Sequence, residues 1–331
     1  MAIKVAINGL GRIGRCVARI VASREDVELV AVNASGSEEM IQYNLRYDTV
    51  HGNRQDIKVE DGYVYIANDK AKLLAERDPA KLEFAALGAD VVLECTGAFL
   101  TQESVQAYID NGIKKVVMSA PAKDDTPTFV MGANEKTYAG QAIVSNASCT
   151  TNGLAPVAKL LDDEYGIEKG LMTTIHSYTS SQPILDAKDK KDPRKGRAGA
   201  TNLIPASTGA AKAIGKVMPH LNGKLNGQAI RVPTPNVSLV DLTVTLKKDT
   251  TLEEVQSAFT KASEGYLKGI LGVDSEGRVS SDFIGEELST VVPLDTIQLI
   301  DGNMVKVLAW YDNEWGYSTR LVDMGVHVAN N

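Results

Sequence analysis

A glycine-rich turn directly after the first apolar run limits the fold of this chain more than any other feature. The β-prone run 3–8 leads into Gly9-Leu10-Gly11-Arg12-Ile13-Gly14, then a stretch with helical spacing, then a second β-prone run at 28–33. The pattern G-x-G-x-x-G indicates a dinucleotide site only in this context. Gly9 permits the tight turn, Gly11 lets a pyrophosphate approach the backbone, and Gly14 lets helix and strand pack closely. We therefore expect a dinucleotide-binding domain built on a Rossmann-type, doubly wound parallel sheet.

Two further apolar runs, 89–95 and 115–118, read as buried strands of the same sheet. Loops at the carboxyl ends of parallel strands line the ligand crevice. The residues just after these runs are therefore candidate cofactor contacts: Thr96, Gly97, Ser119 and Ala120. Cys95 lies within its strand, and we interpret it as core packing.

The position that normally selects NAD carries no acid here. NAD sites place Asp or Glu about 20 residues after the glycine turn, where it accepts hydrogen bonds from the adenosine ribose. This chain reads Asn33-Ala34-Ser35-Gly36-Ser37, with no acid before Glu38. An acid would repel the extra phosphate of NADP, and small polar residues can hydrogen-bond it. We expect use of NADP alongside NAD; the alternative is that the stretch is a simple turn and Asn33 holds the ribose of NAD unaided.

A cysteine near mid-chain has the setting of a nucleophile. Cys149 follows Ser148, a plausible helix cap, and Thr150, Thr151 and Asn152 come next, before a stretch with helical spacing in which Pro156 is tolerable only near the start. The positive end of a helix dipole favours thiolate over thiol. The alternative is a small buried apolar residue. The polar flanks favour the nucleophile, which would attack a carbonyl carbon.

His176 is the candidate base. It lies within the stretch 171–179, at the end of a β-prone run, whereas the other three histidines lie in turn or terminal sequence. Taken alone it is a core histidine. Beside a reactive cysteine it becomes an imidazole that holds the thiolate and moves a proton at the substrate oxygen. Since 27 residues separate the two, only the fold brings them together.

Several segments of the second half predict anion sites. Residues 187–197 hold six basic and two acidic side chains, which makes either a solvated loop or a positive field for phosphorylated substrates. Thr208 and Gly209 open a small-residue helix, and Arg231 precedes a proline-rich turn. Hydroxyls at a helix start together with an arginine fork are typical of a phosphate cradle.

Composition limits the function classes. The chain has 331 residues and a net charge of −7, which disfavours specific nucleic-acid binding. No apolar run approaches the roughly 20 residues that span a bilayer, and no cationic leader is apparent. Three scattered cysteines argue for a reducing compartment, so we expect a cytoplasmic protein. We predict no metal site and no membrane partner.

The second half has a different strand pattern from the first. Alternating runs at 237–246 and 304–310 predict a mainly antiparallel sheet in an α+β catalytic domain. We expect the nucleotide-binding domain at 1–149 and the catalytic domain at 150–313. The helix-prone segment 314–331 is expected to fold back and complete the first domain.

Five motifs together resemble the phosphorylating glyceraldehyde-3-phosphate dehydrogenase family over essentially the whole chain. They are Gly9-Leu10-Gly11-Arg12-Ile13-Gly14-Arg15, Ser145-Asn146-Ala147-Ser148-Cys149-Thr150-Thr151-Asn152, His176-Ser177-Tyr178-Thr179, Arg231-Val232-Pro233-Thr234 and Trp310-Tyr311-Asp312-Asn313-Glu314. The resemblance implies that Cys149 attacks the aldehyde of glyceraldehyde 3-phosphate, that His176 is the base, that hydride passes to NAD(P), and that inorganic phosphate cleaves the thioester. It also implies a homotetramer.

The resemblance assigns further roles. Thr179 and Arg231 hold the substrate phosphate, and Ser148, Thr150, Thr208 and Gly209 hold the attacking phosphate. On the cofactor, Asn313 anchors the nicotinamide amide, Tyr317 packs near its ring, and Arg12, Ile13 and Arg77 contact the pyrophosphate and adenosine side.

The chain departs from the family pattern at four places. Gly153 stands where a second cysteine is common, Ser181 where Asp is usual, Ala34 where the ribose acid is usual, and Ala187-Lys188 where NAD-selective members often have Leu-Pro. A lysine at 188 can pair with a 2′-phosphate across a subunit interface, in agreement with Ala34. Erythrose-4-phosphate dehydrogenase is an alternative within the same chemistry, and a surface or RNA-binding role is an alternative outside it.

Overall fold

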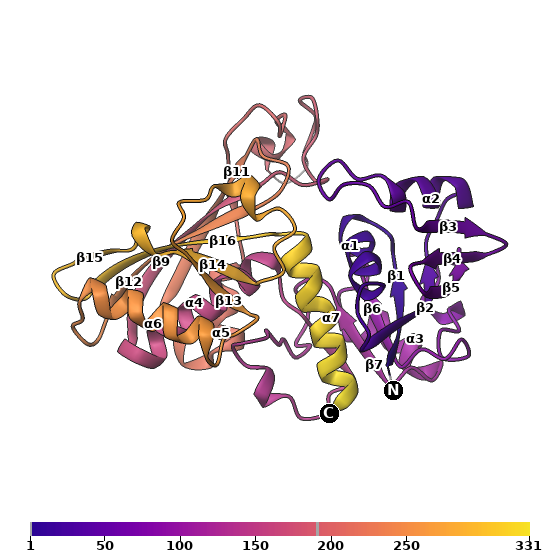
Figure 1. The fold of residues 1–331 in the computed structure, drawn as a ribbon, viewed down its shortest axis with the longest axis horizontal. Coiled ribbons are helices and arrows are strands. Elements are labelled where there is room, and N and C mark those ends of the chain that lie inside the picture. Colours follow the sequence, from indigo (N-terminus) through magenta and orange to yellow (C-terminus); the bar gives the residue numbers. More distant parts are fainter. Residues whose placement is uncertain (1, 190–191) are drawn as a thin grey trace. The chain divides into compact units, whose positions relative to one another are not determined.

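The structure is a computed structural model that describes residues 2–189 and 192–331 (Figure 1). The chain divides into two compact units, one of residues 1–148 with 318–331 and one of residues 149–317. The helices and strands of the first part of the chain are β1 (Ile3–Asn8), α1 (Arg12–Val21), β2 (Val27–Asn33), α2 (Glu38–Arg46), β3 (Ile57–Glu60), β4 (Tyr63–Ile66), β5 (Asp69–Leu74), β6 (Val91–Glu94), α3 (Gln102–Asp110), β7 (Lys115–Met118) and β8 (Ile143–Ser145).

The remaining elements follow in chain order. They are α4 (Cys149–Tyr165), β9 (Ile167–Ser177), β10 (Ile204–Ser207), α5 (Ala210–Val217), β11 (Leu225–Val232), β12 (Ser238–Leu246), α6 (Leu252–Glu264), β13 (Leu271–Asp274), β14 (Thr290–Pro293), β15 (Gln298–Ile300), β16 (Met304–Tyr311) and α7 (Trp315–Asn330).

The first sheet has the order β3-β4-β5-β2-β1-β6-β7-β8. From β5 to β8 all neighbours are parallel, and β3 and β4 add an antiparallel edge. The parallel strands read as continuous apolar runs because helices cover both faces of such a sheet. Figure 1 shows α1 and α3 beside these strands. The order reverses between β1 and β6, which is where a doubly wound sheet binds its ligand.

The last helix supplies part of the first unit. On α7, a Cβ added at Gly325 would lie 3.1 Å from Leu93 of β6, so the helix and the sheet pack closely there. Asp323 of the same helix accepts a hydrogen bond of 2.5 Å from Arg24. These contacts fix α7 from residue 318 onward to the sheet of the first unit.

The second sheet has the order β10-β11-β9-β12-β16-β14-β13, with β15 paired to β16. Most neighbours are antiparallel; the pairs β9–β11 and β13–β14 are parallel. Strand β12 alternates strictly between buried and half-buried residues, as a strand with one covered face does. Helices α4, α5 and α6 pack against these strands. A Rossmann-type sheet and a mainly antiparallel α+β unit confirm the predicted fold class.

Candidate active site

The second unit brings Cys149 and His176 together. Cys149 is the first residue of α4, and His176 is the last residue but one of β9. The Cys149 Sγ and the His176 Nε2 lie 3.5 Å apart, within hydrogen-bond reach for sulfur. The predicted pairing of nucleophile and base across 27 residues is thus present in the structure. Pro156 lies inside α4, farther from the helix start than we expected.

Burial and the charge of Arg231 both act on the pKa values of this pair. The helix start was expected to ionise the thiol, but burial raises the pKa of Cys149, opposed by the charge of Arg231 and by hydrogen bonds from Thr150. Burial and the charge of Arg231 lower the pKa of His176 to about 3, although the Ser177 carbonyl opposes them.

A buried tyrosine, Tyr311, packs against His176 and hydrogen-bonds to α4 and β9, the two elements that carry the pair. The Tyr311 hydroxyl lies 2.9 Å from the Thr150 Oγ1 and 2.7 Å from the Thr174 Oγ1. Its ring meets the imidazole of His176 edge to face, with the centroids 6.0 Å apart. The tyrosine therefore ties the start of α4 to β9 and fixes the plane of the imidazole. In the sequence Tyr311 stands out only as one residue of the motif 310–314, and this role of its hydroxyl was not predicted.

Arg231 lies on β11 directly opposite His176 in the parallel ladder. Its Nη1 is 2.7 Å from the His176 Nδ1 and 3.0 Å from the Ser177 carbonyl oxygen. Arg231 also lines a cavity of about 250 Å³ together with Ser181, Gln182, Asp189, Lys195, Ile204, Ala206 and Ser207. A guanidinium and an ammonium in one small cavity suit an anion.

Other predicted anion ligands lie nearby in the chain. The Thr179 and Ser181 hydroxyls are 2.8 Å apart. Gly209 is the N-cap of α5, and the Thr208 Oγ1 accepts the Ala210 N–H at 3.2 Å. Lys188 is exposed; of the basic stretch 187–197, residues 190 and 191 lie outside the described residues.

The two residues expected at the nicotinamide belong to the second unit. The Asn313 Oδ1 accepts a 2.7 Å hydrogen bond from the Ser238 Oγ, so the amide oxygen is used within the second unit. Tyr317 is buried in the first turn of α7, and its N–H bonds to the Asp312 carbonyl at 3.2 Å. Val237, just before β12, has φ of 66°, a strained value for a β-branched residue of the kind that gathers at functional sites.

The first unit has its own cavity at the glycine turn. It measures about 460 Å³. Of the predicted cofactor contacts, seven line it: Gly9, Gly11, Asn33, Ala34, Ser35, Arg77 and Thr96. Six other predicted contacts from the same unit do not line it: Arg12, Ile13, Gly14, Gly97, Ser119 and Ala120. Ser119 and Ala120 follow β7, the strand next to β6.

The glycines of the turn fit a bound pyrophosphate. A Cβ at Gly14 would lie 1.9 Å from the Gly9 carbonyl oxygen, so the turn and α1 touch there and no side chain fits. A Cβ at Gly11 would meet nothing within 4 Å, which leaves open space in front of the backbone. Gly11 is the N-cap of α1, so no side chain competes for the first N–H groups of the helix, which suit an anion.

Asn33 is committed to the fold and is not free to hold a ribose unaided. Its Nδ2 donates to the Asn8 Oδ1 and to the Glu76 carbonyl oxygen, both at 2.7 Å, and its Oδ1 accepts the Glu76 N–H at 2.9 Å. Ser37 caps α2 by accepting the Met40 N–H at 3.3 Å. Three other side chains line this part of the cavity, those of Ser35, Glu76 and Arg77, and they lie beside the small Ala34.

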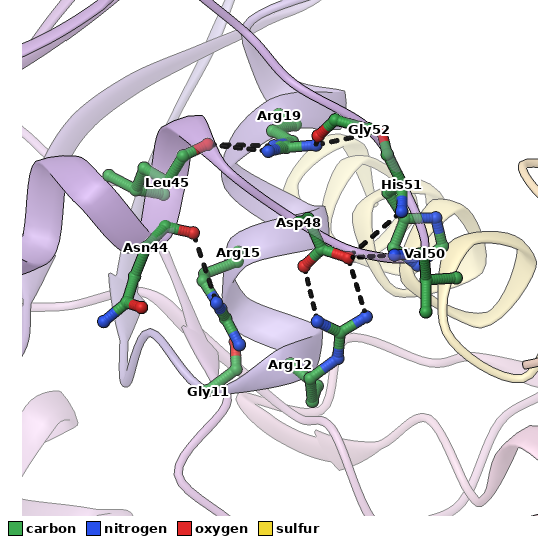
Figure 2. A network of polar contacts seen from close by, with 10 residues as sticks. All are labelled: Gly11, Arg12, Arg15, Arg19, Asn44, Leu45, Asp48, Val50, His51 and Gly52. Carbon is green, nitrogen blue, oxygen red and sulfur yellow. Dashed lines mark hydrogen bonds and ion pairs between the residues drawn. The ribbon is translucent and has the colours of Figure 1, made fainter. Parts of the chain in front are cut away.

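Arg12 is held by an acid in this structure (Figure 2). Its guanidinium forms a two-pronged ion pair with Asp48, which also accepts the N–H groups of Val50 at 2.9 Å and His51 at 3.0 Å. Burial raises the pKa of Asp48, but the hydrogen bonds from Arg12, His51 and Val50 prevail and lower it to about 2. Arg19 braces the same loop by donating to the backbone oxygens of residues 45, 51 and 52.

The buried carboxyl group of Glu94 hydrogen-bonds to Asn8, directly before the glycine turn, and was not predicted from the sequence. Glu94 ends β6; its Oε2 accepts from the Asn8 Nδ2 at 2.7 Å and from the Tyr108 hydroxyl at 2.9 Å, and its Oε1 accepts the Thr96 N–H at 2.8 Å. Burial raises the pKa of Glu94 against these hydrogen bonds. The signal was an acid at the end of an otherwise apolar run. This cluster fixes the loop after β6, where Thr96 lines the cavity.

Comparisons with known proteins agree with this geometry. Residues 3–102 match the family model described as glyceraldehyde 3-phosphate dehydrogenase, NAD binding domain, and residues 148–313 match the model of the C-terminal domain. The chain is 51% identical over 330 residues to glyceraldehyde-3-phosphate dehydrogenase A of Escherichia coli K12 and to the dehydrogenase of Shimwellia blattae, and 50% identical to that of Salmonella typhimurium. Each alignment covers 99% of this chain and 100% of the relative. The chain belongs to the glyceraldehyde-3-phosphate dehydrogenase family.

Proposed function

We propose that this protein oxidises glyceraldehyde 3-phosphate and couples the oxidation to phosphorylation, giving 1,3-bisphosphoglycerate in glycolysis or gluconeogenesis. The observation that carries the proposal is the 3.5 Å approach of the Cys149 Sγ to the His176 Nε2, with Arg231 beside the imidazole. A thiol, a base and a cation in one site are what acyl transfer from a phosphorylated aldehyde requires. Full-length relatives that carry this enzyme name support the assignment.

Cys149 and His176 perform the covalent steps. The Cys149 Sγ attacks the aldehyde carbon, and its proton passes to the His176 Nε2 and from there to the aldehyde oxygen, which gives a hemithioacetal with a neutral His176. His176 then removes the proton of the hemithioacetal hydroxyl as hydride leaves the same carbon, which leaves a thioester. An oxygen of inorganic phosphate attacks the thioester carbon, and the Cys149 thiolate leaves.

Two anion sites hold the phosphates in this proposal. Thr179 and Arg231 bind the phosphate of the substrate, and the Ser181 hydroxyl, 2.8 Å from that of Thr179, takes the place where an acid is usual. Ser148, Thr150, Thr208 and Gly209 bind the attacking phosphate. The start of α5 at Gly209 supports this because its first N–H groups have no partner within the helix.

The residues of the glycine turn fit NAD, which accepts the hydride when bound. Gly9, Gly11 and the first N–H groups of α1, at Arg12, Ile13 and Gly14, receive the pyrophosphate in front of the open space at Gly11. Thr96, Gly97, Ser119 and Ala120 follow the adjacent strands β6 and β7 and border the cofactor. Asn313 donates its amide N–H groups to the nicotinamide, and Tyr317 restricts the ring.

We also propose that NADP is accepted. Ala34 removes the usual repulsion, and Ser35 and the exposed Arg77 stand at the rim of the same cavity. The Asn33 amide is already used within the fold, which leaves the ribose without the side-chain ligand that would favour NAD. Lys188 adds a positive charge from a neighbouring subunit of the proposed homotetramer.

The proposed domain boundaries follow the family pattern: residues 1–149 with 314–331 bind the cofactor, and residues 150–313 carry the chemistry. We propose a cytoplasmic location. No helix within residues 2–189 and 192–331 has the length and apolar character needed to cross a bilayer.

Alkylation tests the chemistry. Cys149 is the only cysteine with partial exposure, since Cys16 and Cys95 are buried. One equivalent of iodoacetamide should therefore abolish phosphate-dependent NADH formation, and Cys149→Ser should do the same while Cys16→Ser retains activity. Full turnover after complete alkylation of Cys149 would refute the mechanism. Running the assay with erythrose 4-phosphate in parallel decides between the two aldehydes.

The ratio of kcat/KM for the two cofactors tests the second proposal. We expect both to support turnover. A preference for NAD above about a hundredfold, roughly 2.7 kcal/mol, would exclude dual use.

A further inference from the structure

A chain of buried side-chain hydrogen bonds crosses the carboxyl ends of the strands that border the cofactor cavity. It begins at the backbone of Glu76, after β5, and passes to Asn33, the last residue of β2. From there it continues to Asn8 at the end of β1 and to Glu94 at the end of β6. All three side chains are buried. Glu94 in turn accepts the N–H of Thr96, so the chain joins the two sides of the cavity.

The backbone of Glu76 fixes the direction of this chain. Its N–H, which only donates, bonds to the Asn33 Oδ1 at 2.9 Å, and its carbonyl oxygen, which only accepts, takes a proton from the Asn33 Nδ2 at 2.7 Å. The second proton of that Nδ2 goes to the Asn8 Oδ1, also at 2.7 Å. Because Asn8 presents its oxygen to Asn33, it presents its Nδ2 to the Glu94 Oε2, at 2.7 Å. Neither amide can be reversed without placing two donors or two acceptors face to face.

Glu94 receives an N–H donor of fixed direction at each of its two oxygens. The Asn8 Nδ2 donates to Oε2, and the backbone N–H of Thr96 donates to Oε1 at 2.8 Å. The hydroxyls of Tyr108 and Thr96 also bond to this carboxyl group, but a hydroxyl can turn its proton, whereas these two N–H groups cannot. Only a side chain with two acceptor oxygens satisfies both N–H groups, so residue 94 has to be an acid and not an amide.

We propose that Glu94 is a positioning residue for the cofactor, because its carboxyl group joins Asn8 and the loop after β6 into one wall of the cofactor cavity. This rests on the proposed function, which places NAD at that cavity. Glu94 acts through Asn8 and Thr96, which line the cavity. Without the carboxyl group, one of the two N–H groups faces another N–H. Asn8 lies on a strand between β2 and β6, whereas Thr96 lies in a loop, so the loop is the part that moves.

Glu94→Gln tests this with a small change of shape. The new amide oxygen can accept from Asn8 or from Thr96, but not from both. We expect the Kd for NAD, measured by calorimetry on the whole enzyme, to rise about tenfold because one buried donor loses its partner, and KM for NAD to rise with it. KM for glyceraldehyde 3-phosphate should stay within about twofold, since its proposed ligands belong to the second unit. A variant that is merely folded in part would instead lower kcat at unchanged KM values.

Glu60→Gln is the matched control. Glu60 lies on β3 of the same unit, where its carboxylate pairs with Lys58 at the surface. The same substitution there should leave the Kd for NAD unchanged. A loss of NAD affinity that is equal in Glu60→Gln and Glu94→Gln would count against a role of the buried carboxyl group.

Reversing one hydrogen bond gives a sharper test. Asn8→Asp alone would place two carboxyl groups in contact, since Asn8 and Glu94 are joined by a 2.7 Å hydrogen bond, and should weaken NAD binding. In the double variant Asn8→Asp with Glu94→Gln, the new amide nitrogen donates to the new carboxylate and the new amide oxygen accepts from Thr96. The carboxylate still accepts from Asn33, and the net charge is that of the wild type. The double variant should therefore restore the Kd for NAD to within about threefold of the wild type, although each single change weakens binding.

A Kd for NAD that Glu94→Gln leaves within about twofold of the wild type, or a double variant that binds NAD no better than either single variant, would overturn the proposal. If Glu94→Gln does not fold, as judged by circular dichroism, the double variant decides: it should fold and bind NAD, and its failure to fold would also overturn the proposal.

Turnover of glyceraldehyde 3-phosphate is measured on the same wild-type sample. If turnover is present and the Kd for NAD does not respond to the variants, the proposed function stands and this inference fails. If the Kd responds as expected and the wild type does not turn over the aldehyde, the reverse holds.

Discussion

The hydroxyl of Tyr311 should be worth more to the second unit than any other single oxygen near the site. Tyr311 is 2% exposed, and its two hydrogen-bond partners, Thr150 and Thr174, are 4% and 0% exposed. Tyr311→Phe keeps the ring against His176 but leaves two buried hydroxyl groups short of a partner. At about 1–3 kcal/mol for each such group, we expect a loss of about 2–6 kcal/mol in the free energy of unfolding.

The chain offers a convenient probe for this loss. Both tryptophans, Trp310 and Trp315, belong to the second unit, so tryptophan fluorescence reports the unfolding of that unit. Urea unfolding at a fixed protomer concentration gives the difference between variant and wild type, because subunit assembly then contributes equally to both. Tyr266→Phe is the matched control, since Tyr266 is 53% exposed in the same unit.

A double variant shows whether the missing partner is the cause. Tyr311→Phe with Thr174→Val removes both ends of one hydrogen bond, so the combined loss should be smaller than the sum of the two single losses. Additive losses, or a change below about 0.5 kcal/mol for Tyr311→Phe alone, would refute the reasoning. Because Thr150 is a proposed ligand of the attacking phosphate, kcat/KM for phosphate should also fall by about fivefold, or about 1 kcal/mol.

Three further predictions concern the first unit. Ala34→Asp places a carboxylate beside the 2′-phosphate of NADP, so the ratio of kcat/KM for NADP to that for NAD should fall by at least about thirtyfold, from a repulsion of 2 kcal/mol or more; an unchanged ratio places the selectivity elsewhere. Gly14→Ala should unfold the turn because a Cβ there would lie 1.9 Å from a carbonyl oxygen. Gly11→Ala, where a Cβ meets nothing within 4 Å, should leave the melting temperature unchanged but weaken NAD binding measured by calorimetry. Equal melting temperatures for the two variants would contradict this. Asp48 has a pKa of about 2, below its unfolded value, so its stabilisation is present above about pH 4 and is lost as the pH falls towards 2. Acid unfolding followed by circular dichroism should show that loss, of about 2 kcal/mol, and Arg12→Met should reduce it; equal acid sensitivity in both proteins would oppose the assignment.

Local sequence patterns were enough to predict the central strands and the glycine turn of the first unit. The run before Gly9 is β1, the run 115–118 is β7, and the glycine turn lies where the order of the sheet reverses. These features depend on neighbours in the chain, because period, turn chemistry and glycine spacing act over a few residues. Cys149 at the start of a helix and His176 at the end of a strand were accessible for the same reason.

Hydrogen-bond partners that lie far apart in the sequence could not be predicted. Asn33 was a ribose ligand in the alternative interpretation, but Asn8 and Glu76 consume its amide, and nothing near residue 33 announces them. Asp48 holds Arg12 from a loop 36 residues away. Hydrogen bonds of this kind depend on how the elements pack, so the position of a polar residue in the sequence does not identify its partner.

The protonation of Cys149 shows the same limit in energetic terms. A helix start contributes about 0.3–1 kcal/mol to an exposed charge, whereas burial of an ion costs several kcal/mol. The sequence displays the helix start but not the burial, so it favoured a thiolate where burial raises the pKa of the thiol. The pKa of His176 is lowered by burial and by the charge of Arg231, and neither cause is visible in the sequence around residue 176.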